Sequence, residues 1–276
     1  MSEQIKRAAA ALREADALLV SAGAGMGVDS GLPDFRGTEG FWRAYPVTAK
    51  LGLSFEQMAN PAWFQTDPHL AWAFYGHRLN LYRRTEPHQG FNHLLEIGSR
   101  KPHSYWVFTS NVDGHFQRAG FAPQRIVECH GSIHHLQCTR PCCHEIWEAE
   151  GETVTIDESA FRALDPLPRC RFCSALARPN ILMFGDWSWL DGRTRDQQVR
   201  FRLWEEGLHE SSARLVVVEL GAGTAIPTVR HTSERLAEKL RGTLIRINSR
   251  EATVPDNAIG LSLPALEGMQ RLYAAL

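Results

Sequence analysis

Residues 17–37 read ALLVSAGAGMGVDSGLPDFRG, and the interpretation of the whole chain starts from this stretch. It begins with the apolar run Ala17–Val20 and breaks into small residues from Ser21 onward. An apolar run that feeds a glycine turn is typical of a buried parallel strand followed by a loop whose backbone approaches another group closely. Glycine suits such a loop because it has no Cβ, and the backbone N–H groups there can bind a phosphate. The stretch therefore predicts a strand and a phosphate-binding loop.

The loop departs from the fingerprint of hydride-transferring dehydrogenases. That fingerprint, G-x-G-x-x-G, requires glycine at position 28, where the chain has Val28. An acidic residue that binds a ribose is expected about 20 residues after the turn, but residues 41–43 read FWR. These two departures disfavour an ordinary dehydrogenase.

Composition indicates a globular protein with one large domain, or one domain with a small insert. The chain has 276 residues, of which 43% are hydrophobic and 22% charged, and its formal net charge is -1. A net charge this close to zero argues against general binding to nucleic acid. No apolar run approaches the ~18 residues that span a membrane, and residues 3–16 are typical of an amphipathic helix rather than of a signal peptide. We therefore expect a cytoplasmic protein with neither nucleic acid nor membrane as a partner.

Strands and helices alternate along much of the chain. Apolar or β-branched runs at 105–108, 213–220 and 243–248 each end in polar or glycine-rich loops. Helices are expected at about 68–84, 90–99, 196–212, 231–241 and 263–276. This pattern predicts a doubly wound parallel, Rossmann-like sheet of the α/β class. The aromatic helical stretch at about 40–85 and the cysteine-containing stretch at about 132–180 are interpreted as insertions that form a smaller part. The larger part then comprises about 1–39, 86–131 and 181–276.

Five of the six cysteines lie in two tight clusters, at 138–143 and 170–173. Two close cysteine pairs separated by a loop indicate a tetrahedral four-cysteine zinc site. Cys170 and Cys173 form the second pair, and Cys138 belongs to the first with either Cys142 or Cys143. Cys142 is preferred because it gives the shorter turn. Two complete pairs leave no open coordination position, so one structural zinc ion per chain is expected.

Four segments, taken in order, resemble the sirtuin family of NAD-dependent protein deacylases, in a divergent bacterial-type form. They are GAGMGVDSGLPDFRG from Gly23, TSNVDGHFQRAG from Thr109, HGS from His130 and RPNILMFGD from Arg178. The resemblance covers nearly the whole chain. It implies a single catalytic domain that uses NAD as co-substrate and removes acyl groups from protein lysines, giving nicotinamide and O-acyl-ADP-ribose. It also implies that the cysteine module is structural.

The resemblance assigns roles to individual residues. His130 becomes the catalytic base, because a neutral imidazole can accept a proton from a ribose hydroxyl near neutral pH. Asn111 and Asp113 become catalytic residues that line a nicotinamide pocket. The residues implied to bind NAD are Ala22, Gly23, Ala24, Gly25, Asp34, Phe35, Arg36, Ser110, Asn111, Asp113, Gly221, Ala222, Gly223 and Asn248.

The acyl-lysine substrate has its own candidate residues. Tyr75 and Arg78 are three apart on a predicted helix and resemble the Y-x-x-R element of sirtuins that remove succinyl and malonyl groups. A guanidinium can pair with the carboxylate of such an acyl chain, and a phenol can add a hydrogen bond. Ile181, Met183 and Phe184 are expected to form the walls of the lysine tunnel, beside a strand edge that can pair with a peptide.

Some positions depart from the family pattern. Ser110 replaces a glutamine, Phe116 replaces a histidine, and Ala222 with Gly223 replaces Thr-Ser, while Thr224 could compensate for the lost hydroxyl groups. Two alternatives stay open; the departures favour the first, and the presence of His130 and Asp113 argues against the second. One is a mono-ADP-ribosyltransferase or NAD glycohydrolase on the same scaffold. The other is a non-catalytic sensor of NAD or ADP-ribose.

Overall fold

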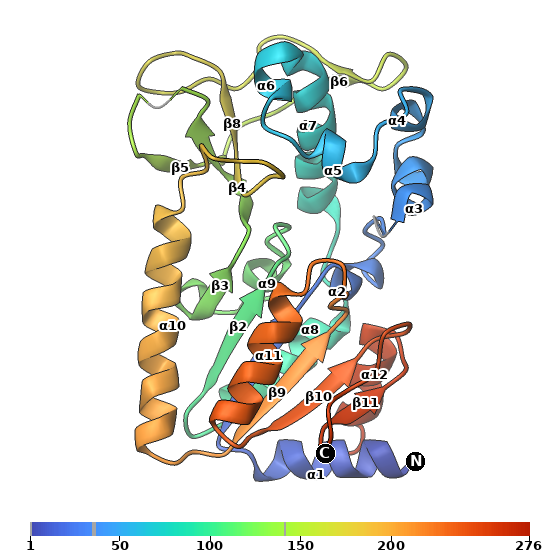
Figure 1. The fold of residues 1–276 in the computed structure, drawn as a ribbon, viewed down its shortest axis with the longest axis vertical. Helices are drawn as coiled ribbons and strands as arrows, with labels where there is room; N and C mark the ends of the chain where they lie inside the picture. Colours follow the sequence, from blue (N-terminus) through green and yellow to red (C-terminus); the bar gives the residue numbers. More distant parts are fainter. Residues whose placement is uncertain (1, 35–36, 141) are drawn as a thin grey trace.

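Six parallel strands form the central sheet of the chain. The computed structural model describes residues 2–34, 37–140 and 142–276. The strands lie in the order β11-β10-β9-β1-β2-β3 (Figure 1). Their bounds are β1 (Ala17–Ala22), β2 (Tyr105–Thr109), β3 (Ile126–Glu128), β9 (Leu215–Leu220), β10 (Thr243–Ile247) and β11 (Ile259–Leu261). The doubly wound parallel sheet predicted from the sequence is confirmed.

The winding of the sheet reverses between β1 and β9. β1 pairs with β2 on one side and with β9 on the other. The chain moves outward from β1 to β2 and β3, and later returns to β9 before it moves outward again to β10 and β11. Doubly wound folds bind ligands in the crevice at such a reversal, outside the carboxyl ends of the strands. The two glycine loops of the sequence follow β1 and β9, so both lie at this point.

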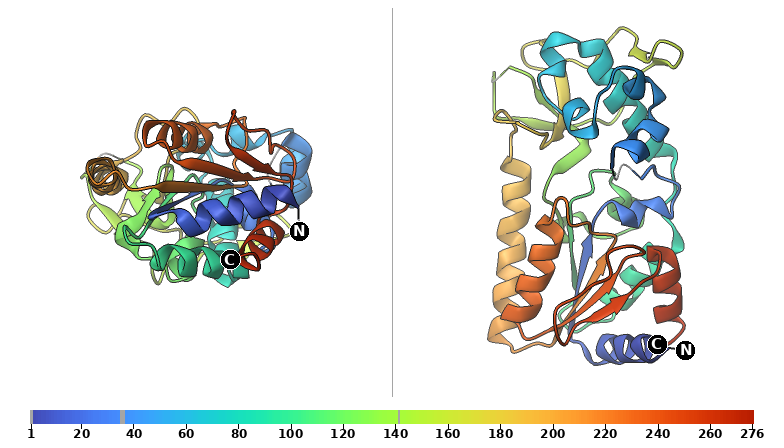
Figure 2. Two further views of the ribbon diagram at one scale, coloured as in Figure 1. Left: turned by 90° about the horizontal axis from the view of Figure 1, so that it is seen from below. Right: turned by 45° about the vertical axis from the view of Figure 1, so that its right-hand side comes forward.

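Helices cover both faces of the sheet, so β1 is buried on both sides. Leu18 and Val20 belong to one hydrophobic cluster, and Ala17 and Leu19 belong to another. The first cluster is completed by α1 (Glu3–Glu14), α8 (Gln89–Ser99) and α12 (Ala265–Tyr273), and the second by α10 (Gly192–Glu210) and α11 (Thr228–Lys239). The views of Figure 2 show these helices on opposite sides of the sheet. Short helical turns α2 (Gly25–Val28), α9 (His115–Arg118) and η1 (Pro123–Arg125) connect the strands.

Helix α10 begins at Gly192, four residues earlier than expected. The reason lies in contacts that the local sequence does not show. The hydroxyl of Thr194 donates to the carbonyl of Glu128 at 3.1 Å, and Arg193 forms an ion pair with the Glu128 carboxylate. Contacts with β3 therefore stabilise a first helical turn whose own sequence is polar and contains glycine.

The smaller part lies beyond the carboxyl ends of the sheet, at the top of Figure 1. Its helices are α3 (Gly37–Ala44), α4 (Pro46–Lys50), α5 (Phe55–Met58), α6 (Trp63–Thr66) and α7 (Pro68–Arg84). Its antiparallel sheet has the order β5-β4-β8, with β4 (Gly131–Cys138), β5 (Ile146–Glu148) and β8 (Ala177–Ile181), and a hairpin joins β6 (Ile156–Asp157) to β7 (Arg162–Ala163). The helical stretch and the cysteine stretch share one hydrophobic cluster. The exact limits of the two parts stay a prediction.

Helix α7 matches its expected bounds. Asp67 accepts a hydrogen bond from the backbone N–H of Leu70 at 3.2 Å, and Pro68 occupies the first helical position. The segment between the two cysteine clusters contains the short strands β5, β6 and β7. Across residues 2–34, 37–140 and 142–276, the structure contains no helix with the length and apolar character needed to span a bilayer.

Candidate functional site

The two glycine loops meet at the reversal point of the sheet. The Gly25 N–H donates to the Gly221 carbonyl at 3.0 Å, and the Gly23 N–H donates to the Leu220 carbonyl at 3.0 Å. A Cβ on Gly25 would lie 2.7 Å from the Cα of Gly221. Gly221 also has a φ of +60°, a conformation that L side chains rarely adopt. Glycine is therefore needed at both positions for one loop to pack on the other.

The segment after β2 packs against the first glycine loop. The Ser110 N–H donates to the Ala22 carbonyl at 3.1 Å. The side-chain amide of Asn111 donates to the Gly23 carbonyl at 3.0 Å. These bonds join the expected nicotinamide segment to the expected phosphate loop at one edge of the sheet.

Asp113 is buried beside the same loop. Its Oδ1 accepts a hydrogen bond from the His115 N–H at 2.9 Å. A Cβ built on Gly27 would lie 3.6 Å from Asp113 Oδ2, so the carboxylate faces the turn that follows Gly25. His134 Nε2 makes a 2.8 Å hydrogen bond with the Asp113 carbonyl. The backbone and side chain of Asp113 are thus both held in place.

His130 follows β3 and lies next to the same segment. Burial lowers the pKa of its imidazole, and a hydrogen bond with the Ser110 backbone opposes that shift. The ring is therefore neutral near pH 7 and can accept a proton. The His130 carbonyl accepts from the Leu182 N–H at 3.0 Å, which ties this segment to the end of β8. His130, Asn111 and Asp113 are thus brought to one edge of the sheet.

The second glycine loop is anchored by Asn248. The Asn248 amide donates to the Ala222 carbonyl at 2.9 Å, and its oxygen accepts from the N–H groups of Arg250 and Glu251, both at 3.0 Å. The Thr224 hydroxyl donates to Glu251 at 2.5 Å. Asn248 therefore positions this loop, and that role had not been expected from the sequence.

The remaining residues expected at the cofactor site are distributed around the two loops. Ala22 is buried at the end of β1, Ala24 is exposed, and Gly223 is half-buried beside Glu251. Asp34 forms an ion pair with Arg250 at 3.5 Å. Phe35 and Arg36 lie outside the described residues.

Four cysteines gather in the smaller part. The sulfur atoms of Cys138, Cys142, Cys170 and Cys173 all lie within 4.8 Å of one another. Cys143 is not a member of this group, although its sulfur lies 3.5 Å from that of Cys142. Four thiolates around one point are the donor set of a tetrahedral structural zinc site. The residues present fit that ion, with Cys142 rather than Cys143 as the second ligand.

Tyr75 and Arg78 are buried on α7 in an aromatic setting. The guanidinium of Arg78 lies 5.2 Å from the centre of the Phe74 ring and 5.7 Å from that of Tyr75. Arg78 Nε donates to the Tyr82 hydroxyl at 3.0 Å. The Tyr75 hydroxyl is buried and has no hydrogen-bond partner within the described chain. Sequence analysis missed Tyr82, although its i,i+4 spacing from Arg78 on one helix could have indicated the contact.

The three expected tunnel residues follow or end β8. Ile181 and Met183 are buried, and the Phe184 N–H donates to the Ala59 carbonyl at 2.9 Å. Arg178 binds both carboxylate oxygens of Asp186, at 2.7 and 3.0 Å, with both side chains almost fully buried. This ion pair, which sequence analysis had not singled out, fixes the loop that carries Met183 and Phe184.

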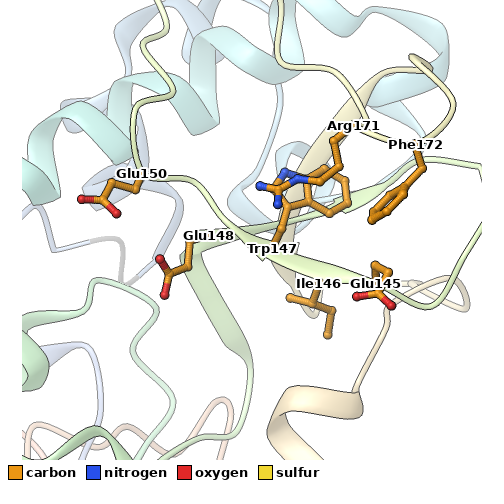
Figure 3. A pocket seen from close by; sticks show the side chains of 7 residues that line it. All are labelled: Glu145, Ile146, Trp147, Glu148, Glu150, Arg171 and Phe172. Carbon is orange, nitrogen blue, oxygen red and sulfur yellow. The ribbon is translucent and has the colours of Figure 1, made fainter.

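A pocket of about 420 Å³ lies away from this edge, on the outer side of the cysteine module. Figure 3 shows Arg171 stacked over Trp147, with its guanidinium 5.4 Å from the ring centre and Phe172 close by. Arg171 and Phe172 belong to the turn between Cys170 and Cys173, so these contacts dock that turn on β5. The pocket does not include His130, Asn111 or Asp113.

The fold and the site define an α/β protein whose two glycine loops meet at the reversal of its sheet, with a four-cysteine module inserted beside it. The model of the Sir2 family matches residues 23–196, which is more than half of the chain. The chain belongs to the Sir2 family.

Individual relatives and structures agree with this membership. The chain is 33% identical over 178 residues to the NAD-dependent protein deacylase 2 of Pseudomonas syringae pv. tomato, covering 64% of this chain and 66% of the relative. It is 32% identical to the NAD-dependent protein deacylase 1 of Archaeoglobus fulgidus, over 63% of this chain and 62% of the relative. These matches span just under two thirds of the relatives' lengths. A solved complex of a Sir2 homologue variant with ADP-ribose superposes over 100% of this chain and 96% of its own, with a TM-score of 0.71 and 26% identity.

Proposed function

We propose that this protein removes acyl groups from protein lysines in an NAD-dependent reaction. The observation that carries the proposal is the position of His130. Its neutral imidazole lies beside the Ser110 backbone, on the edge where Asn111 and Asp113 pack against the first glycine loop. The relatives named NAD-dependent protein deacylases support this reaction class.

In this proposal the chain mainly positions groups and excludes water. NAD, when bound, supplies the ribose carbon that accepts the acyl oxygen as nicotinamide leaves. Asn111 and Asp113 would hold the carboxamide of nicotinamide. His130 accepts the proton of a ribose hydroxyl through a ring nitrogen. The products are free lysine, nicotinamide and O-acyl-ADP-ribose.

The acyl-lysine peptide is proposed to pair with the chain beside β8, with Ile181, Met183 and Phe184 around the lysine. Tyr75 and Arg78 favour an acidic acyl group such as succinyl. The buried guanidinium offers a positive charge, and the Tyr75 hydroxyl is a buried donor that lacks a partner within the described chain. Burial raises the pKa of Tyr75, so the phenol stays protonated and can donate a hydrogen bond to a carboxylate.

Mass spectrometry of three peptides tests the proposal. Acetyl-lysine, succinyl-lysine and unmodified peptides are each incubated with NAD and with either the protein or its His130→Ala variant. Loss of the acyl group that requires both NAD and His130 is the expected result. Consumption of NAD without deacylation would overturn the proposal in favour of ADP-ribosyl transfer or NAD hydrolysis. Binding of NAD without release of nicotinamide would indicate a sensor.

A further inference from the structure

The outer face of α10 carries an exposed apolar pair. Val199 is 47% exposed and Leu203 is 63% exposed, and they are one helical turn apart. The opposite face is buried through Thr194, Phe201 and Leu208, among others. At 3.6 residues per turn, Val199 and Leu203 lie on the side of the helix that faces away from the protein. Figures 1 and 2 show α10 at the outer edge of the molecule.

Gly207 continues this face by one more turn. A Cβ built on Gly207 would meet no atom of the described chain within 4 Å. Glycine in the interior of an exposed helix is unfavourable by about 1 kcal/mol relative to alanine. A small residue in line with Val199 and Leu203 leaves a shallow notch into which another helix can pack.

The charges of α10 are distributed unevenly along its axis. Among its exposed charged residues, Arg195, Asp196, Arg200 and Arg202 lie in the first eleven positions, and Glu206 and Glu210 lie in the last five. The first group has a net charge of +2 and the second a net charge of −2. This distribution opposes the helix dipole, which favours acidic residues near the N-terminus and basic residues near the C-terminus. It is, however, complementary to itself when two copies of the helix lie antiparallel.

We propose that the outer face of α10 pairs with the same face of a second copy of this chain, with the helices antiparallel about a two-fold axis near Leu203. In this arrangement Leu203 contacts its own counterpart, and Val199 lies opposite Gly207 of the second copy. Positions on the same flank face each other across an antiparallel pair. Arg202 therefore approaches Glu206 of the second copy, and Arg195 approaches Glu210.

Most of the charged side chains that would pair across the dimer are exposed and form no ion pair within the described part of one protomer. Arg202, Glu206 and Glu210 are exposed, and none has an ion-pair partner among the described residues. Arg195 pairs with Asp191, the residue directly before α10, and the two side chains are 70% and 44% exposed. Exposed pairs of this kind contribute little in a monomer, but several of them around an apolar contact define orientation and partner.

The length of α10 limits the area that the dimer buries and therefore its affinity. α10 has 19 residues, which corresponds to about 28 Å of helix. Stable interfaces bury about 800 Å² per partner, and one helix pair of this length buries less. The dimer is therefore weak, forms as the protein concentration rises, and weakens as salt screens the charged flanks.

Sedimentation of the zinc-loaded, full-length protein over a range of concentrations tests the proposal. The expected result is a reversible shift from the 31.0 kDa monomer toward twice that mass. Leu203→Glu, which places two carboxylates at the two-fold axis, lowers the association constant by at least about tenfold. Leu164→Glu is the matched control, because Leu164 is 46% exposed and lies in the smaller part; it leaves association unchanged. A protein that stays monomeric up to about 1 mM overturns the proposal, and so does a dimer that Leu203→Glu does not weaken.

Charge exchange tests the antiparallel orientation separately. Arg202→Glu and Glu206→Arg each place like charges together and weaken the dimer, whereas the double variant restores the pair and recovers association. Thermal unfolding of each variant shows whether the monomer is intact. A double variant that associates no better than the single variants overturns the antiparallel arrangement.

Discussion

Gly25 and Gly221 lie backbone against backbone at the reversal point of the sheet, joined by a hydrogen bond of 3.0 Å. Neither position has room for a side chain. The two loops that follow β1 and β9 therefore form a single packed unit, and each glycine is required by the other loop.

Gly221→Ala should destabilise the fold. The new Cβ would lie 2.4 Å from the Gly25 backbone, at a φ of +60°. Strain of this conformation alone costs about 1–3 kcal/mol, and the contact adds to it. Thermal unfolding measures the change. Gly223→Ala is the matched control in the same loop, because its Cβ would meet an ordinary contact at 3.4 Å. Equal melting temperatures for the two variants would contradict the account of loop packing.

The pH profile of deacylation should reflect a neutral His130. Burial lowers the pKa of this imidazole. As the pH falls, kcat/KM should therefore stay constant past pH 6.5 and decrease only at the lower pH at which the ring becomes protonated. His130→Ala should lower kcat by about 10²–10⁴-fold while NAD still binds. Initial rates from about pH 5 to 8, together with calorimetric titration of NAD, check both statements. If the decrease in kcat/KM at low pH persists unchanged in His130→Ala, that decrease belongs to the titration of another group.

Zinc content should distinguish Cys142 from Cys143. Cys142→Ser removes one of the four sulfur atoms that cluster within 4.8 Å. Bound zinc should fall well below one ion per chain, and the smaller part should lose stability. Cys143→Ser should keep the metal, because Cys143 is outside the cluster. Metal analysis of the two purified variants is the measurement, and the reverse ranking would make Cys143 the ligand.

Acyl preference should depend on Arg78. Arg78→Met removes the buried positive charge, so desuccinylation should fall at least about tenfold more than deacetylation. Tyr82→Phe, which removes the hydroxyl that accepts from Arg78 Nε, should have a smaller effect in the same direction. Parallel rates on acetyl and succinyl peptides decide the matter. Equal losses on both substrates would reduce Arg78 to a structural residue.

Stability should decrease as the pH falls below about 6.5. Burial lowers the pKa values of His88 and His134, and burial together with Arg193 and His134 lowers that of His135 to about 3. As the pH falls, these histidines bind protons near pH 6.5 in the unfolded chain but only at lower pH in the folded chain. The free energy of unfolding is therefore highest above pH 6.5 and decreases below it. Urea unfolding at about pH 8 and pH 5 measures the slope. His135→Gln should flatten this slope.

Features specified by local spacing could be predicted from the sequence. The cysteine clusters predicted the metal module, and Asp67 with Pro68 predicted the start of α7. Features that depend on distant partners could not be predicted. β11 has three residues and depends on pairing with β10. The contact between the glycine loops depends on strand order, and the Arg178–Asp186 ion pair depends on the turn after β8. The catalytic and binding roles assigned to His130, Asn111 and Asp113 stay predictions.

The hydrophobic cluster of the smaller part contains Tyr75 of α7 together with Cys138 and Cys170. Trp72 Nε1 also donates to the Ala177 carbonyl at 3.0 Å. A shared interior of this kind opens as one cooperative unit in hydrogen exchange. Partial chelation should therefore loosen the surroundings of Tyr75 while the β1–β9 crevice stays closed. Loss of a metal ion from the cysteine cluster would then alter acyl preference at a distance, and a metal-depleted protein should bind NAD yet lose its discrimination between acyl groups.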